Sequence, residues 1–169
     1  MLALVLPSFL CTASCVPDKR PQTKNITPDS SVYSMLGRTM SDVLFNPNSV
    51  TCYTLRGVEK ADSVATEIEP HWVRDSLVGR LTPQMYGILQ FVLISNIGNY
   101  EKDTIRVKAP YIPSLEFEFR QKKSVVHVLI STSDYTWTVM YDDKRQLHFN
   151  YQDRELISRF CEMIIESIR

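Results

Sequence analysis

Apolar and polar side chains alternate with a period of two over the last third of the chain, which predicts an antiparallel sheet. In the first such segment the apolar positions are Leu115, Phe117 and Phe119, and charged residues stand between them. Because successive side chains of a strand point to opposite faces, the segment should have one buried and one solvated face. The sequence therefore predicts a strand with Glu116 and Glu118 in solvent.

The register of the next two strands is predicted by matching apolar positions across each turn, because a one-residue slip would bring the wrong face inward. A two-residue turn at Lys122-Lys123 places Phe117 opposite Val128. A four-residue turn at residues 131–134 then places Val128 opposite Trp137. Every inward residue meets an inward residue in this alignment.

A third hairpin and a C-terminal helix complete the predicted layers. A three-residue turn around residues 143–145 pairs Val139 with Phe149. From about Asp153, apolar residues recur at helical spacing at Leu156, Ile157, Phe160, Cys161, Ile164, Ile165 and Ile168. The nearest surface that can bury this stripe is the inward face of the meander. We therefore expect an α+β fold, with a C-terminal antiparallel β-meander of about four to six strands packed against amphipathic helices.

Upstream segments predict further helices and strands. Helical spacing over residues 30–45 predicts one helix, and β-forming residues over 50–55 predict a strand. Residues 72–78 indicate a short helix. Thr82-Pro83 supplies an N-cap and a first-turn proline for a helix that is apolar almost all round and therefore expected to be buried. Residues 104–109 alternate as a strand does.

The N-terminus has the pattern of an export signal. Residues 1–10 are apolar apart from Ser8, which is too short a run to span about 30 Å of hydrocarbon as a helix. The run Thr12-Ala13-Ser14-Cys15 resembles the lipobox of bacterial lipoproteins. The resemblance implies that Cys15 becomes the lipid-modified N-terminus and that the protein is anchored to a membrane of the bacterial cell envelope. The alternative is a buried N-terminal strand or helix of a cytosolic protein.

Chain length and composition set the domain organisation. The 169 residues, 44% of them hydrophobic, suffice for one domain with a core of its own. We expect a signal peptide over residues 1–14, a flexible tether over 15–29 that is rich in proline, and a single α+β domain over 30–169. Lysine plus arginine equals aspartate plus glutamate at 19 each, which argues against a nucleic-acid binder.

Two cysteines remain if Cys11 leaves with the leader and Cys15 is lipidated. Cys52 and Cys161 are far apart in sequence and belong to no Cys-x-x-Cys zinc motif. They are either a disulfide pair formed in an oxidising compartment or two small apolar core residues.

The predicted register brings one polar group together. It places Glu118 opposite His127 on the wet face, with Thr138 beside His127 on the next strand. A carboxylate next to an imidazole is a candidate acid/base pair, and the alternative, which we favour, is an ordinary cross-strand polar pair. His148 should lie two strands from His127, too far for both to ligate one zinc ion, so no metal site is expected.

No motif of a phosphate loop, dinucleotide fingerprint, nucleophile elbow or zinc protease is present, and no cofactor is expected. The sequence therefore favours an exported envelope lipoprotein that acts as a non-enzymatic binding or structural protein. Its expected partners are the membrane, through the N-terminal lipid, and a protein of unknown identity, but not nucleic acid. The alternatives are a small enzyme that uses the Glu118–His127 pair and a periplasmic inhibitor or immunity-type protein.

Overall fold

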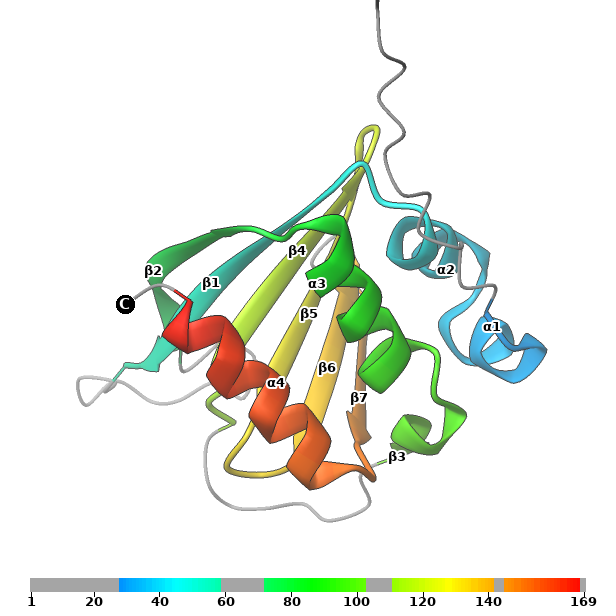
Figure 1. Cartoon of the computed structure of the whole chain (residues 1–169). Coiled ribbons are helices and arrows are strands. Elements are labelled where there is room, and N and C mark those ends of the chain that lie inside the picture. Colours follow the sequence, from blue (N-terminus) through cyan, green and yellow to red (C-terminus); the bar gives the residue numbers. More distant parts are fainter. Residues whose placement is uncertain (1–27, 59–71, 103–110, 142–144, 168–169) are drawn as a thin grey trace, which may run out of the picture.

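The computed structural model describes residues 28–58, 72–102, 111–141 and 145–167, and it has the α+β fold expected from the sequence. Helices α3 and α4 lie side by side across one face of an antiparallel sheet (Figure 1). The strands are β1 (Ser49–Gly57), β2 (Trp72–Arg80), β3 (Glu101–Lys102), β4 (Leu115–Gln121), β5 (Ser124–Ser131), β6 (Thr136–Tyr141) and β7 (Arg145–Asn150). The helices are α1 (Ser30–Leu36), α2 (Arg38–Phe45), α3 (Pro83–Leu89), α4 (Arg154–Glu166), the π-helix η1 (Gln90–Ile94) and the 3₁₀ helix η2 (Ile97–Tyr100).

Over the described residues the sheet has seven strands in the order β2-β1-β4-β5-β6-β7-β3, one more than the upper end of the expected range. The four strands of the predicted meander, β4 to β7, are consecutive neighbours in it. Strands β1 and β2 extend the sheet on one side, and the short β3 ends it on the other. The meander is therefore the middle of a larger sheet.

The first hairpin has the register that the sequence predicts. Phe117 lies opposite Val128, and Gln121 pairs with Ser124, which leaves Lys122 and Lys123 as a two-residue turn. Lys122 has φ 55°, in the left-handed region. Lysine is an unusual residue for that position, since turns of this kind favour glycine or asparagine.

The predicted registers of the second and third hairpins are wrong by two residues. Val128 lies opposite Val139, and Trp137 lies opposite Phe149. The same side chains still face the core, because a shift of two residues preserves the alternation of faces. Ser131 belongs to β5 and pairs with Thr136, so the turn begins one residue later than predicted.

Residues 72–80 form a strand, and the short helix predicted over 72–78 is wrong. Strand β2 pairs antiparallel with β1, with Leu77 opposite Tyr53 and Ser76 opposite Thr54. The amide of Ser76 donates to Oγ1 of Thr54 at 3.1 Å. Pairing with the open edge of β1 satisfies the backbone of this segment, so tertiary context overrides a weak helical pattern.

The helix predicted over residues 30–45 is two helices. Gly37, at φ 77° and ψ 166°, separates α1 from α2, a conformation that glycine adopts without steric penalty. The carboxylate of Asp29 accepts a hydrogen bond from the amide of Ser31 and begins α1. Helix α2 packs against β4 and β5, so the break allows both short helices to bury their apolar faces.

The helix after Thr82 begins as predicted but is not buried all round. The Thr82 hydroxyl accepts a hydrogen bond from the amide of Met85 at 3.3 Å, and Pro83 occupies the first turn. The helix continues through η1, where the Ser95 amide bonds to the carbonyl of Gln90. Phe91 in this segment is 70% exposed, which corrects the expectation of a fully buried helix.

Helix α4 covers the apolar face of the sheet, as predicted. The Asp153 carboxylate caps its first turn by accepting from the amide of Leu156 at 3.1 Å. The Phe160 ring lies 6.1 Å from that of Phe117 on β4. Cys52 and Cys161 are both buried and free, so the candidate disulfide is not formed and the core alternative describes them.

Asn99 connects the helical layer to the sheet. Its side-chain amide donates to the carbonyls of Val92 and Leu93 at 3.0 Å, and its Oδ1 accepts from the amide of Gln152 at 3.0 Å. Its backbone carbonyl accepts from Nε1 of Trp137 at 2.5 Å. The buried side chain of Asn99 therefore links η1 to the start of α4, and the backbone carbonyl of Asn99 positions Trp137 of β6.

The predicted signal peptide, the tether up to residue 27 and the strand expected over 104–109 lie outside the described residues. Within the described ranges, every helix is too short or too polar to cross a bilayer.

Candidate functional site

The polar group predicted on the sheet is only partly assembled as expected. Glu118 on β4 lies opposite His127 on β5, as the register of the first hairpin requires. Thr138 does not lie beside His127: it pairs with Leu129, and Met140 occupies the position opposite His127. The two-residue shift of the second hairpin is the cause, and it removes Thr138 from the candidate acid/base pair.

Two residues that the sequence analysis did not include in the candidate pair, Glu116 and Arg74, hold this group together. Nδ1 of His127 lies 2.7 Å from Oε1 of Glu116, one of the two residues expected in solvent. Arg74 on β2 forms a two-point contact with Glu116, from Nε at 2.8 Å and from Nη2 at 2.6 Å. The same Nη2 atom donates to Oε2 of Glu118 at 2.8 Å. Arg120 donates from Nε to Oε1 of Glu118 at 2.5 Å.

Both carboxylates are buried, which corrects the expectation of a wet face. The side chains of Glu116 and Glu118 are 4% and 6% exposed, whereas that of Arg74 is 39% exposed. The guanidinium carbon of Arg74 also lies 3.9 Å from the centre of the Tyr53 ring. Arg74 thus forms a lid over the carboxylates, supported by an aromatic face on the neighbouring strand.

The electrostatics of the group favour ionised carboxylates. Burial by itself would raise the pKa of Glu116, but hydrogen bonds from Arg74 and then His127 outweigh it and lower the pKa to about 2. The pKa of Glu118 is also lowered, because the contacts of Arg120 and Arg74 outweigh the effect of burial. The pKa of Arg74 is raised, chiefly by its hydrogen bond to Glu116. All three groups are therefore charged at neutral pH.

Glu116, Glu118 and His127 offer one ligand atom each within 4.8 Å of one another, which is close enough for a metal ion. Carboxylate oxygens and imidazole nitrogens also suit a divalent cation. However, all four carboxylate oxygens already accept hydrogen bonds from Arg74 or Arg120. A cation would have to displace two arginines whose charges already balance the two carboxylates. These residues therefore form an ion-pair network and do not fit a metal site.

A second polar pair lies on the same face of the sheet. Oγ1 of Thr138 is 2.7 Å from Nδ1 of His148, and the Tyr111 ring packs edge-on against the His148 ring at 4.9 Å. A hydroxyl next to an imidazole is the arrangement of a nucleophile and its base. Thr138 is 0% exposed, so no substrate reaches this hydroxyl in the observed conformation. The sequence analysis did not predict this pair, because it depends on the register of the third hairpin, which differs from the predicted one.

A cleft open to solvent lies at one end of the sheet, and no residue of either polar group lines it. Its volume is about 520 Å³, and it lies between the α2–β1 loop, the end of β2 and the start of α3. Phe45, Pro47, Leu81 and Tyr86 form much of its apolar wall, and Arg80 is its one charged lining residue. Its walls carry no histidine, cysteine, aspartate or glutamate, so they offer a binding surface rather than an acid or base.

Comparison of the chain with protein-family models, with curated proteins and with solved structures finds no match.

Proposed function

We propose that this chain is an exported, lipid-anchored protein of the bacterial cell envelope, with a domain that serves as a non-enzymatic binding or structural module. The observation that carries the proposal is the ion-pair network on the sheet. It engages Glu118, the carboxylate of the acid/base candidate that the sequence offered, and Glu116, the carboxylate that contacts His127, and it favours the ionised form of both.

The alternative of an enzyme that uses the Glu118–His127 pair loses support from this geometry. General acid/base catalysis works best when the catalytic group has a pKa near the operating pH and can reach the substrate. Glu116, which contacts His127, has a pKa of about 2, and its side chain is 4% exposed. Glu118 is held between Arg74 and Arg120. These contacts describe a network that stabilises the sheet.

Two features support a binding role. The solvent-open cleft has the size of a small-ligand or peptide-side-chain pocket. Ile88 and Phe91, three residues apart on the outer side of α3 and η1, are 41% and 70% exposed. Neighbours at this spacing lie together on a helix surface, so they offer an apolar contact to a partner protein.

The anchor rests on the lipobox-like run that ends at Cys15. Helix α1 begins at Ser30, where the predicted tether over residues 15–29 ends. Labelled fatty acid fed to bacteria that express the full chain tests this step. We expect the label in the wild type and in Cys11→Ala, and its loss in Cys15→Ala. Label that remains on the Cys15→Ala chain would refute lipid anchoring at this residue.

The binding role is tested by cross-linking in the native envelope. We expect a specific partner to be captured by the wild type and by a Leu156→Ser control, which changes a 41% exposed side chain on α4. The Phe91→Ser variant should capture it at least several-fold less. Equal capture by both variants would show that the exposed surface of α3 and η1 is not the contact.

A further inference from the structure

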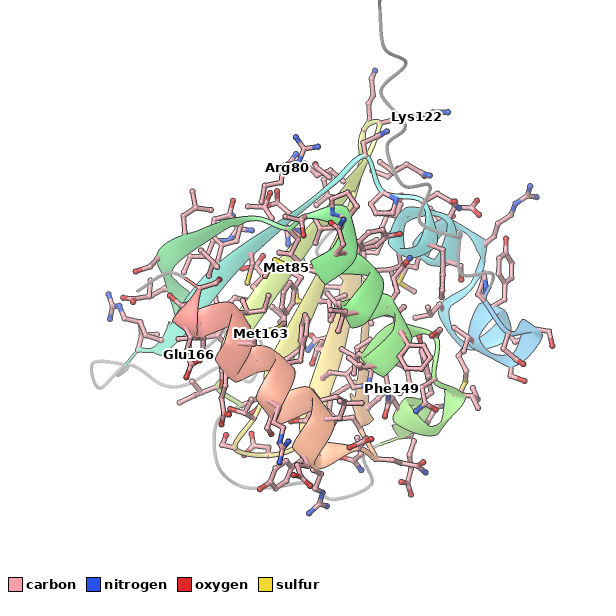
Figure 2. The ribbon with its side chains drawn as sticks, in the orientation of Figure 1. Arg80, Met85, Lys122, Phe149, Met163 and Glu166 are labelled. Atoms are coloured by element: carbon pink, nitrogen blue, oxygen red, sulfur yellow. The ribbon has the colours of Figure 1, made fainter. Side chains whose placement is uncertain are left out.

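Three basic side chains gather at one end of the sheet. Arg80 ends β2, and Lys122 and Lys123 form the turn between β4 and β5. Asn48 links the two segments: its carbonyl accepts from Nη2 of Arg80 at 2.8 Å, and its Oδ1 accepts from the amide of Lys122 at 2.8 Å. Figure 2 shows Arg80 and Lys122 projecting from this same end. We call Arg80, Lys122 and Lys123 the basic end.

No carboxylate among the described residues neutralises the basic end. On the neighbouring elements, Glu118 is paired with Arg120 and Arg74, and Asp42 is paired with Arg38. The cleft beside Arg80 has no acidic residue in its walls. Because acidic and basic residues balance over the whole chain at 19 each, three unopposed cations at one end are a local asymmetry and not a consequence of composition.

The turn between β4 and β5 has a lysine at a position of backbone strain. Lys122 has φ 55°, a region that L-residues with a side chain occupy at a penalty and that glycine occupies freely. A backbone outlier of this kind supports the hypothesis that the side chain has a function, one that glycine or asparagine at the same position could not provide. Here the side chain that is retained carries a positive charge into solvent.

We propose that the basic end docks on the anionic phospholipid surface of the membrane in which Cys15 anchors the chain, with lipid phosphates contacting Arg80, Lys122 and Lys123. This inference rests on the proposed function. A basic patch can act together with a lipid anchor in attaching a protein to an anionic membrane. Each lysine or arginine at an anionic surface strengthens binding roughly fivefold. Three cations are few for a nucleic-acid site, where six to ten phosphate contacts are common.

The tether is long enough for this docking. Extended chain from Cys15 to Pro28 spans at most about 50 Å, whereas the longest strands of the sheet are about 30 Å long. The anchored domain can therefore turn its basic end to the lipid headgroups. Docking at that end would fix the orientation of the domain and leave the exposed Phe91 on the helical layer available to a protein partner.

Sedimentation of the full chain with lipid vesicles tests the inference. One vesicle type contains phosphatidylcholine alone, and the other replaces a quarter of it with phosphatidylglycerol. The apolar N-terminal segment contributes equally to both, so the ratio of the two affinities isolates the effect of charge. We expect a ratio of about 100 for the wild type, and a ratio near 1 in about 0.5 M sodium chloride.

Matched variants locate the effect. The double variant Lys122→Gly/Lys123→Gln removes two charges. It also relieves the strained turn, so weaker binding would not reflect misfolding. We expect the ratio of its affinities for anionic and neutral vesicles to be about 30-fold lower than that of the wild type. Lys102→Gln/Arg154→Gln removes two charges at the opposite end of the meander, where Arg154 packs on Tyr135 of the β5–β6 turn, and it should keep the wild-type ratio.

Three results would overturn the inference: a wild-type ratio near 1, an equal loss in both double variants, or tighter binding to duplex DNA than to anionic vesicles at the same salt concentration. The last result would assign the basic end to nucleic acid. None of them affects fatty-acid labelling at Cys15, so failure of the docking inference and failure of the proposed anchor are separable.

Discussion

Nδ1 of His127 lies 2.7 Å from Oε1 of Glu116, although Glu118 is the residue directly opposite His127 across β4 and β5. The contact is therefore diagonal, and Glu118 is bound by Arg74 and Arg120. Glu116 receives Arg74 and His127 on the same oxygen. The carboxylates are thus tied to three strands of the sheet, and their removal from solvent depends on one arginine of the edge strand β2.

Replacing Arg74 with alanine should destabilise the fold more than loss of an ordinary surface charge. The substitution leaves two buried carboxylates with fewer partners. We expect unfolding in urea to show a loss of about 2–3 kcal/mol, less than for a fully buried pair because Arg74 is 39% exposed. Arg56→Ala, which removes an exposed pair with Asp75, should change stability by no more than about 0.5 kcal/mol. Equal effects of the two substitutions would contradict a structural role for the network.

Stability should fall in acid because of Glu116. Its pKa is lowered from 4.5 to about 2 in the folded chain. A carboxyl group with a lowered folded pKa contributes stability that is complete above its unfolded pKa and is lost as the pH falls toward its folded pKa. The network should therefore lose about 3 kcal/mol between roughly pH 5 and pH 2. Urea midpoints measured at several pH values should show this decline, and Glu116→Gln should flatten it. A wild-type profile that stays level down to pH 3 would disagree.

The thiols of Cys52 and Cys161 should be inert in the folded protein. Burial raises the pKa of Cys52 well above its usual range and that of Cys161 to about 12, so neither forms a thiolate near neutral pH. In a Cys11→Ser/Cys15→Ser chain, a disulfide reagent at pH 8 should modify neither thiol until denaturant is added, and then both. Fast reaction of the folded chain would contradict burial of the thiols. Fewer than two reactive thiols per chain after unfolding would contradict their free state.

The strained turn predicts opposite effects for two adjacent substitutions. Lys122→Gly removes the penalty at φ 55° and should raise the free energy of unfolding by about 0.5–1 kcal/mol. Lys123→Gly removes the same charge at a position without positive φ and should lower it by about 0.5 kcal/mol. Urea unfolding of the two variants in parallel gives the comparison. Equal changes in both would indicate an effect of charge and not of backbone conformation.

Local patterns were sufficient for several elements. Thr82 and Asp153 begin helices where their capping side chains stand, and Lys122-Lys123 forms the turn that aligns Phe117 with Val128. These features depend on residues close in sequence. The predicted helix over 72–78 was wrong because its conformation is decided by β1, a strand that is distant in sequence.

The candidate site was predictable only in part. The cross-strand pair of Glu118 and His127 follows from one short hairpin, but Thr138 was misplaced because the second hairpin closes two residues from the expected register. Arg74 had no pattern that would connect it to Glu116. The two residues are 42 positions apart, and only the pairing of β2 with β1 brings them together.

The sequence by itself determined which side of each central strand faces the core, because alternation of apolar residues with period two requires one burial pattern. It did not determine the alignment along the strands, since a shift of two residues keeps every apolar side chain inside. Only the tertiary structure decided that the polar face is also covered. There Arg74 from a distant strand compensates the charge of Glu116 and Glu118, and a buried carboxylate is stable only where such a partner is supplied.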